Sequence, residues 1–300
     1  MFRIRRNEAQ QPGIRAAWRP KGLRARSAAA TLLLIAGAFV APSHHTTVTG
    51  GPLYDAMGQY QGQDVLTVQE QKATTGEIYV LSLRATGIPG GSADSGAQAF
   101  TAWLALSSAS SGYQYLAVPT ELMYPHGASN ADTQNPDAAR LAAQNYLGRP
   151  VQVQVNVPEA NSQDLMLTLA MINKLSAEKL MADPPDLSQP VNRREVNIYR
   201  DRLTGSARVN ADGTVHSAGA LEYKLRAAGE NFAPYFIIAQ EDCEQLAHIK
   251  PSSRMYIRDR TDGIPYYEEI RIIPVSTVDG AVQAMRLIRD SKDNELPRCS

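Results

Sequence analysis

Ser162 and Lys224 are the two residues of this 300-residue sequence whose types and surroundings best fit a chemical role. A serine hydroxyl is a poor nucleophile until a nearby base removes its proton. A lysine amine can be that base only when it is neutral, so burial or a neighbouring cation must lower its pKa. The pair therefore predicts acyl transfer in which Ser162 attacks a carbonyl and Lys224 is the general base, a chemistry that needs no metal ion and no cofactor.

The elements predicted around Ser162 place it between a strand and a helix. Valines alternate with polar residues over 151–157, which predicts a strand with one buried face. Apolar residues at helical spacing over 165–175 predict the helix that follows. Taken alone, Ser162 is better explained as an ordinary helix N-cap, because serine is among the best capping residues. Its position between a strand and a helix, together with the motif around Lys224, makes the catalytic interpretation an equal alternative.

Lys224 falls in a predicted helix over 221–228, which follows a hairpin over 208–215 that turns at Asp212-Gly213. A solvated surface lysine is the plain alternative for Lys224 in isolation. Helices and strands alternate from residue 151 onward, so we expect an α/β or α+β fold for this half of the chain. The acidic pair Glu241-Asp242 is interpreted as a cap and surface charge rather than as a catalytic carboxylate pair.

The composition excludes two classes of protein. Hydrophobic residues make up 43% of the chain and charged residues 20%, which rules out a disordered chain. The net charge is zero, but residues 1–26 carry eight basic side chains and one acidic one, so the remainder has an excess of acidic residues. We therefore expect no nucleic-acid surface.

An apolar run over 28–41 follows the basic head and is broken only by Thr31 and Gly37. It predicts an uncleaved transmembrane helix over 27–43, with residues 1–26 in the cytoplasm and the rest of the chain outside the cell membrane. A signal-peptide core and a buried core helix are the alternatives, because the run is short for a membrane span.

Cysteine and histidine residues give little support for a metal site. The two cysteines, Cys243 and Cys299, leave open whether they form a disulfide. The five histidines are scattered and no paired metal-ligand spacing occurs, so no metal site is predicted.

Residues 151–288 resemble the proteolytic domain of the Lon family, so we delimit a Lon-like domain over 151–290. The segments that carry the resemblance are a hairpin, a small-residue turn, a lysine-bearing helix, a buried strand and a final strand and helix. They are Asp212-Gly213-Thr214-Val215, Gly219-Ala220-Leu221, Lys224 with Ala227-Ala228, Tyr235–Ala239 with Glu241-Asp242-Cys243, and Ile273-Pro274-Val275 with Ala281-Val282.

The N-terminal half resembles bacterial membrane-anchored Lon-like proteases that carry a PDZ domain. The matching features are Gly51-Pro52-Leu53-Tyr54, Thr75-Gly76-Glu77-Ile78, the helix around Trp103, Val118-Pro119-Thr120-Glu121 and Tyr124-Pro125. In that group the PDZ domain lies between the Tyr-Pro segment and the protease. Here Tyr124 and Ser162 are too close in sequence for a PDZ domain, so we expect residues 44–150 to form only a β-rich segment.

The resemblance implies a serine endopeptidase that acts on peptides or proteins through Ser162 and Lys224. It also implies a supporting hydroxyl 18 positions before the lysine, where Ser206 stands. A ring-shaped hexamer would follow by analogy. The sequence has no phosphate-binding loop of the Gly-x-x-x-x-Gly-Lys-Ser/Thr type, so ATP dependence would require a partner.

The serine segment departs from the family's Gly-Pro-Ser-Ala-Gly, because it is Ala160-Asn161-Ser162-Gln163-Asp164. A carboxylate at Asp164 would oppose a developing oxyanion and would favour the charged form of Lys224. The sequence therefore leaves a second interpretation open, in which an inactive Lon-like domain serves as an anchored interaction or scaffold module.

Overall fold

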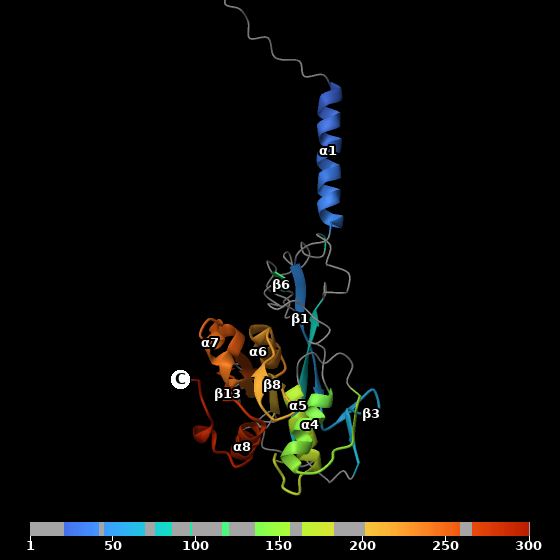
Figure 1. The fold of residues 1–300 in the computed structure, drawn as a ribbon. Coiled ribbons are helices and arrows are strands. Elements are labelled where there is room, and N and C mark those ends of the chain that lie inside the picture. The colour runs from blue at the N-terminus through green and yellow to red at the C-terminus, as the bar shows by residue number, and fades with distance from the viewer. Residues whose placement is uncertain are drawn as a thin grey trace, which may run out of the picture.

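A mixed sheet lies at the centre of the fold in a computed structural model, which describes residues 21–41, 45–69, 76–85, 97, 116–119, 136–156, 164–182, 202–258 and 266–299 (Figure 1). The sheet has seven strands in the order β13-β10-β8-β5-β1-β6, and β9 pairs with β8 beside this path. The strands are β1 (His45–Asp55), β5 (Glu77–Ala85), β6 (Leu116–Pro119), β8 (Arg202–Val209), β9 (Val215–Ser217), β10 (Tyr235–Ala239) and β13 (Arg271–Val275).

Both halves of the chain contribute to this sheet, and the fold is α+β. Strands β8, β10 and β13 run parallel to one another, and β5 is parallel to β8 through the pairs Glu77–Arg202 and Ile78–Leu203. Strand β1 pairs antiparallel with both β5 and β6. The β-rich segment expected over 44–150 therefore continues the sheet of the C-terminal half, in which β8, β10 and β13 lie.

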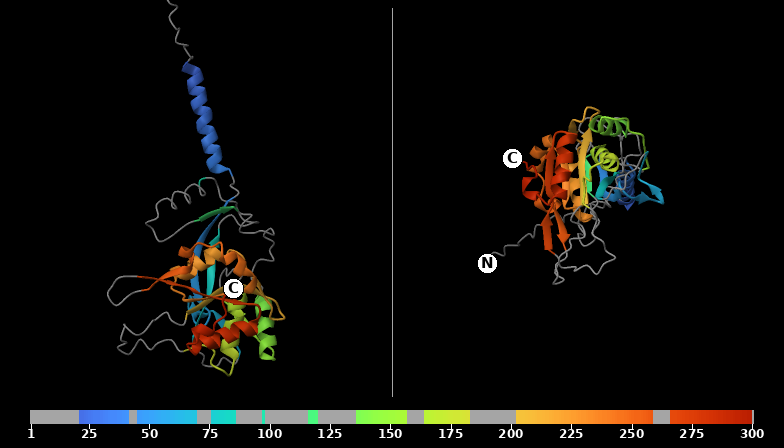
Figure 2. Two further views of the ribbon diagram at one scale, coloured as in Figure 1. Left: turned by 90° about the vertical axis from the view of Figure 1, so that its left-hand side faces the viewer. Right: turned by 90° about the horizontal axis from the view of Figure 1, so that it is seen from below.

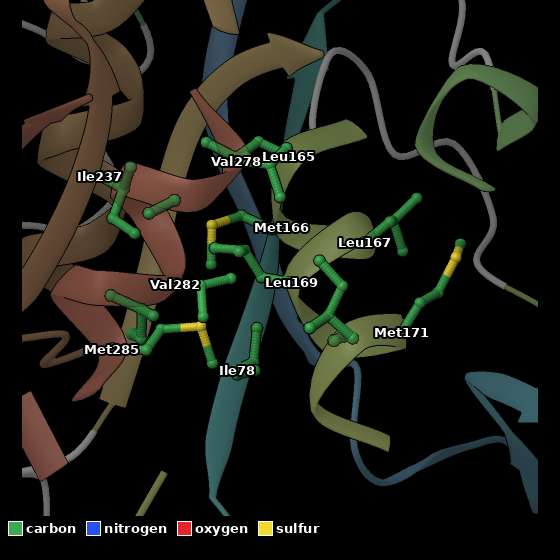
Figure 3. Close-up of a cluster of buried hydrophobic side chains, with 14 of the residues drawn as sticks. Ile78, Leu165, Met166, Leu167, Leu169, Met171, Ile237, Val278, Val282 and Met285 are labelled. Carbon is green, nitrogen blue, oxygen red and sulfur yellow. The ribbon is translucent and has the colours of Figure 1, made fainter. Parts of the chain in front are cut away.

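Helices cover the two faces of the sheet, as the alternation along β10 shows. Ile237 packs in a core with the helices α4 (Pro136–Leu147), α5 (Asp164–Leu175) and α8 (Val278–Arg289). Figure 3 shows Ile237 beside Met166, Val282 and Met285 in this core. Phe236 and Ile238 belong to the opposite core, with the helix α6 (Leu221–Glu230).

Three two-stranded sheets and several helical turns complete the described elements. The paired strands are β2 (Gln59–Tyr60) with β3 (Gln63–Asp64), β4 (Leu66–Val68) with β7 (Val153–Val155), and β11 (Met255–Arg258) with β12 (Tyr266–Glu269). The helical turns are η2 (Gln240–Asp242), α7 (Cys243–Leu246), η3 (Pro251–Arg254) and η4 (Asp293–Glu295).

A disulfide between Cys243 and Cys299, 56 residues apart, joins the start of α7 to the C-terminal segment. The sequence left this pairing open. The bond fixes the chain directly after Asp242, because Cys243 is the next residue.

The structure contradicts the expected transmembrane helix. A helix, α1 (Lys21–Val40), does form there and projects from the rest of the fold (Figure 2). It includes Lys21, Arg24 and Arg26, so its apolar part is shorter than the helix itself. Within the described residues, no helix combines the length and the apolar character that a membrane crossing requires.

Candidate active site

The helix α6 begins at an unusual backbone turn that places Lys224 in its opening turn. Gly219 and Ala220 both have positive φ, 65° and 54°, so two successive residues are left-handed before the helix starts. Glycine adopts this conformation without strain, whereas alanine does not. The turn reverses the chain after β9, so that α6 lies back across the sheet.

Lys224 is buried at this turn and has the low pKa that a base requires. Its side chain is 2% exposed. Its pKa is lowered from 10.5 to about 7, chiefly by burial and also by the nearby cation Arg208, whereas Asp242 and Asp164 act in the opposite direction. A substantial fraction of Lys224 is therefore neutral near pH 7.

The Lys224 amine makes fewer hydrogen bonds with the described residues than it can donate. Its Nζ donates to the carbonyl oxygen of Ala218 at 3.2 Å. Among the described residues this is its one hydrogen bond, although an ammonium group has three donors. A second buried lysine, Lys174 at the end of α5, shows the contrast, because its Nζ donates at 2.7 Å to Leu66 O and lies near the carboxylates of Asp55 and Asp64.

Ser206 lies on the same side of the sheet as α6. It is in register with Ile238 of β10, and Ile238 packs in the α6 core. Because residues in register on neighbouring strands point to the same face, the Ser206 side chain points toward α6. It is 1% exposed, and its Oγ has no hydrogen-bond partner within the described part of the chain.

Asp242 follows β10 and is also buried, at 1% exposure. Burial raises its pKa, against the opposing effects of hydrogen bonds from the Ser217 side chain and the Ala239 backbone and of the charge on Lys224. Its Oδ1 has no hydrogen-bond partner among the described residues. The interpretation of Glu241-Asp242 as cap and surface charge fits Glu241, which is exposed, and Asp242 does stand at the N-cap position of α7, but Asp242 is buried and not surface charge. Its position after five consecutive buried residues, Tyr235–Ala239, was the available signal.

Asp164 is the first residue of α5 and brings that helix's N-terminus toward Lys224. It is 5% exposed, and its charge raises the pKa of Lys224. The sequence predicted this direction of effect. Ser162 and Gln163 lie outside the described residues, so of the three predicted site residues the structure describes Lys224 and Ser206.

The described residues of the site gather near the carboxyl ends of two parallel strands. Ser206 and Arg208 belong to the second half of β8, and Asp242 follows β10. In open α/β sheets this is the edge where ligands bind. Sequence reasoning missed Arg208, which carries no distinguishing motif. No group of three His, Cys, Asp or Glu residues in the described ranges is arranged to hold a metal ion.

Comparison with known proteins gives no independent identification. No protein-family model matches the chain, and no curated protein matches it. The resemblance to Lon-like proteases therefore rests on the motifs in the sequence, and the function that follows from it is a proposal.

Proposed function

We propose that the protein is a serine endopeptidase of the Lon-like class, with Ser162 as nucleophile and Lys224 as general base. The observation that carries the proposal is the burial of Lys224, which lowers its pKa to about 7 at the carboxyl ends of the parallel strands. An ordinary surface lysine remains protonated at neutral pH and cannot accept a proton from serine.

The proposed reaction proceeds through an acyl-enzyme. The Ser162 oxygen attacks the peptide carbonyl carbon while Lys224 Nζ accepts the hydroxyl proton. The C–N bond then breaks, and Lys224 returns the proton to the leaving amine. Water, deprotonated by Lys224, attacks the ester carbonyl; the ester C–O bond then breaks, Lys224 returns the proton to the Ser162 oxygen, and the acid is released. Ser206 supplies a hydroxyl that orients the amine during these transfers.

The sequence distance between Ser162 and Asp164 is compatible with this mechanism. Asp164 lies near enough to Lys224 to affect its pKa. Two residues of chain span at most about 7 Å, which sets an upper limit on the distance between Ser162 and Asp164. The start of α5 also offers backbone N–H groups, which are the donors that an oxyanion needs.

The charge of Asp164 favours the second candidate function, an inactive Lon-like domain that serves as an interaction or scaffold module. Its carboxylate raises the pKa of Lys224 and would oppose an oxyanion near the start of α5. Because burial outweighs this effect on Lys224, we favour the active enzyme.

A fluorophosphonate probe distinguishes the two functions on the purified full chain. We expect covalent labelling of the wild type, with the label on Ser162, and loss of labelling in Ser162→Ala and Lys224→Ala. Lys174→Ala is the matched control, because it removes a different buried lysine, and it should still be labelled if it folds. A folded wild type that resists the probe would favour the inactive module.

A further inference from the structure

Three buried polar groups near the start of α6 have unused hydrogen-bonding capacity within the described residues. They are the Nζ of Lys224, the Oγ of Ser206 and the Oδ1 of Asp242. An unpaired polar atom in a protein interior costs free energy, so such groups are uncommon and often functional. Ser206 and Lys224 have assigned roles in the proposed reaction, whereas Asp242 has none.

Asp242 is held in place from three directions. The Ser217 side chain and the Ala239 backbone both hydrogen-bond to its carboxylate. The preceding residue, Glu241, accepts a hydrogen bond from the backbone N–H of Ser217 through Oε1. The following residue, Cys243, forms the disulfide with Cys299. These contacts tie η2 to the segment between β9 and α6, which carries Lys224.

The charges that act on Lys224 come from three different elements, and Asp242 has the largest effect among them. After burial, the causes of its shifted pKa are in order Asp242 on η2, Arg208 on β8 and Asp164 on α5. The charged groups of the other neighbours have partners elsewhere. Arg254 of η3 donates to the carbonyls of Leu246 and Ile249, and Glu222 of α6 accepts from Ser253 Oγ.

We propose that Asp242 is a positioning residue: through Ser217 its buried carboxylate holds the segment whose Ala218 carbonyl accepts the hydrogen bond of the Lys224 amine, and its charge acts on that amine. The influence is mutual, because the charge of each group favours the charged form of the other. Asp242 therefore favours the protonated lysine, opposite to burial and Arg208. This inference rests on the proposed function only where it takes peptide hydrolysis as the reaction that Lys224 assists.

The titration of Lys224 measures this role without any assay of activity. In full-length protein with ¹⁵N-labelled lysine, NMR would follow the Lys224 amine between pH 5 and pH 10. We expect Asp242→Asn to lower the midpoint by roughly one pH unit, since it removes a nearby negative charge but keeps the side chain's shape. Glu244→Gln is the control, because it removes an exposed carboxylate two residues away and should leave the midpoint unchanged.

The reciprocal variant covers the case in which Asp242→Asn does not fold. Lys224→Met removes the cation that lowers the pKa of Asp242, so the Asp242 carboxyl, followed by ¹³C NMR, should titrate at higher pH. An unchanged or oppositely shifted midpoint in either folded variant would overturn the role of Asp242. If the two titration midpoints shift as expected but the wild type is not labelled by the fluorophosphonate probe, the peptidase function is rejected and the coupling between Asp242 and Lys224 stands.

Discussion

The Lys224 amine donates a hydrogen bond to the carbonyl of Ala218, a residue six positions earlier that precedes the left-handed turn at Gly219 and Ala220. The helix α6 and the turn before it are thus joined by the side chain proposed as the base. A change in the turn's backbone must therefore affect the position of the amine.

The activity of the proposed peptidase should depend on pH through Lys224. Only the neutral amine accepts the proton of Ser162, so kcat/KM for a peptide substrate should rise as pH increases through about 7, where the pKa of Lys224 lies. Lys224→Arg should lose activity by several orders of magnitude at every pH, because a guanidinium group is not deprotonated. A Lys224→Arg enzyme with the wild-type rate would contradict the role of Lys224 as base.

The stability of the protein should also depend on pH at this residue. Between pH 7 and 10.5 the unfolded chain keeps a proton on Lys224 that the folded chain has released, so the free energy of unfolding rises with pH. Lys224→Met removes this dependence, which amounts to about 1.4 kcal/mol per pH unit. Urea denaturation should show that the stability of Lys224→Met relative to the wild type is greatest below pH 7 and decreases toward pH 10. Lys250→Met, at an exposed site, is the control. A difference in stability between the wild type and Lys224→Met that is equal at all pH values would disprove the lowered pKa of Lys224.

The two left-handed residues before α6 should respond oppositely to substitution. A Cβ at Gly219 would meet no atom within 4 Å, so Gly219→Ala adds backbone strain alone and should destabilise the protein by about 1 kcal/mol. Ala220→Gly relieves such strain at φ 54° and should stabilise it by up to about 1 kcal/mol. Thermal unfolding of both variants measures the effects, and a loss of stability in both would refute the argument from backbone conformation.

The elements with strong local patterns were predicted from the sequence, whereas contacts between distant segments were not. The strand Tyr235–Ala239 has its predicted bounds, and the helix expected over 165–175 begins one residue earlier, at Asp164. The sequence also predicts a single strand over 268–275, which the structure divides at Ile270 into β12 and β13. The N–H of Ile270 donates to Arg254 O. Hydrophobic periodicity within one segment cannot reveal a hydrogen bond to a different segment.

The candidate site was likewise predicted from the sequence only in part. The burial of Lys224 was required by the proposed chemistry, and the motif around it located the residue. The burial of Asp242 depends on the segment around Ser217, which is far from it in sequence, and on the disulfide to Cys299. The pairing of β5 with β8 likewise joins residues 125 positions apart, such as Glu77 and Arg202, whose side chains form an ion pair at 2.9 Å.

Gly205 should tolerate no larger residue, because α5 and β10 both approach it closely. A Cβ there would lie 2.6 Å from the carbonyl oxygen of Ile237 and 2.9 Å from Met166 Sδ. The methionine can move, but the β10 backbone cannot without disturbing the sheet. Gly205→Ala should therefore lower the free energy of unfolding by about 1–3 kcal/mol. Gly280→Ala is the control, since its φ is not positive and a Cβ there would lie no closer than 3.4 Å to a neighbouring atom. An equal loss in the two variants would contradict the steric explanation.

The disulfide should contribute to stability and to the position of Asp242 together. It closes a loop between residues 56 positions apart, for which the chain-entropy model gives about 4 kcal/mol. Reduction, or the double substitution Cys243→Ser and Cys299→Ser, should lower the urea midpoint accordingly, and dithiothreitol should have no further effect on the double variant. Because Cys243 adjoins Asp242, the same loss should alter the Lys224 titration. A double variant with wild-type stability and wild-type titration would show that the other contacts of η2 hold Asp242 unaided.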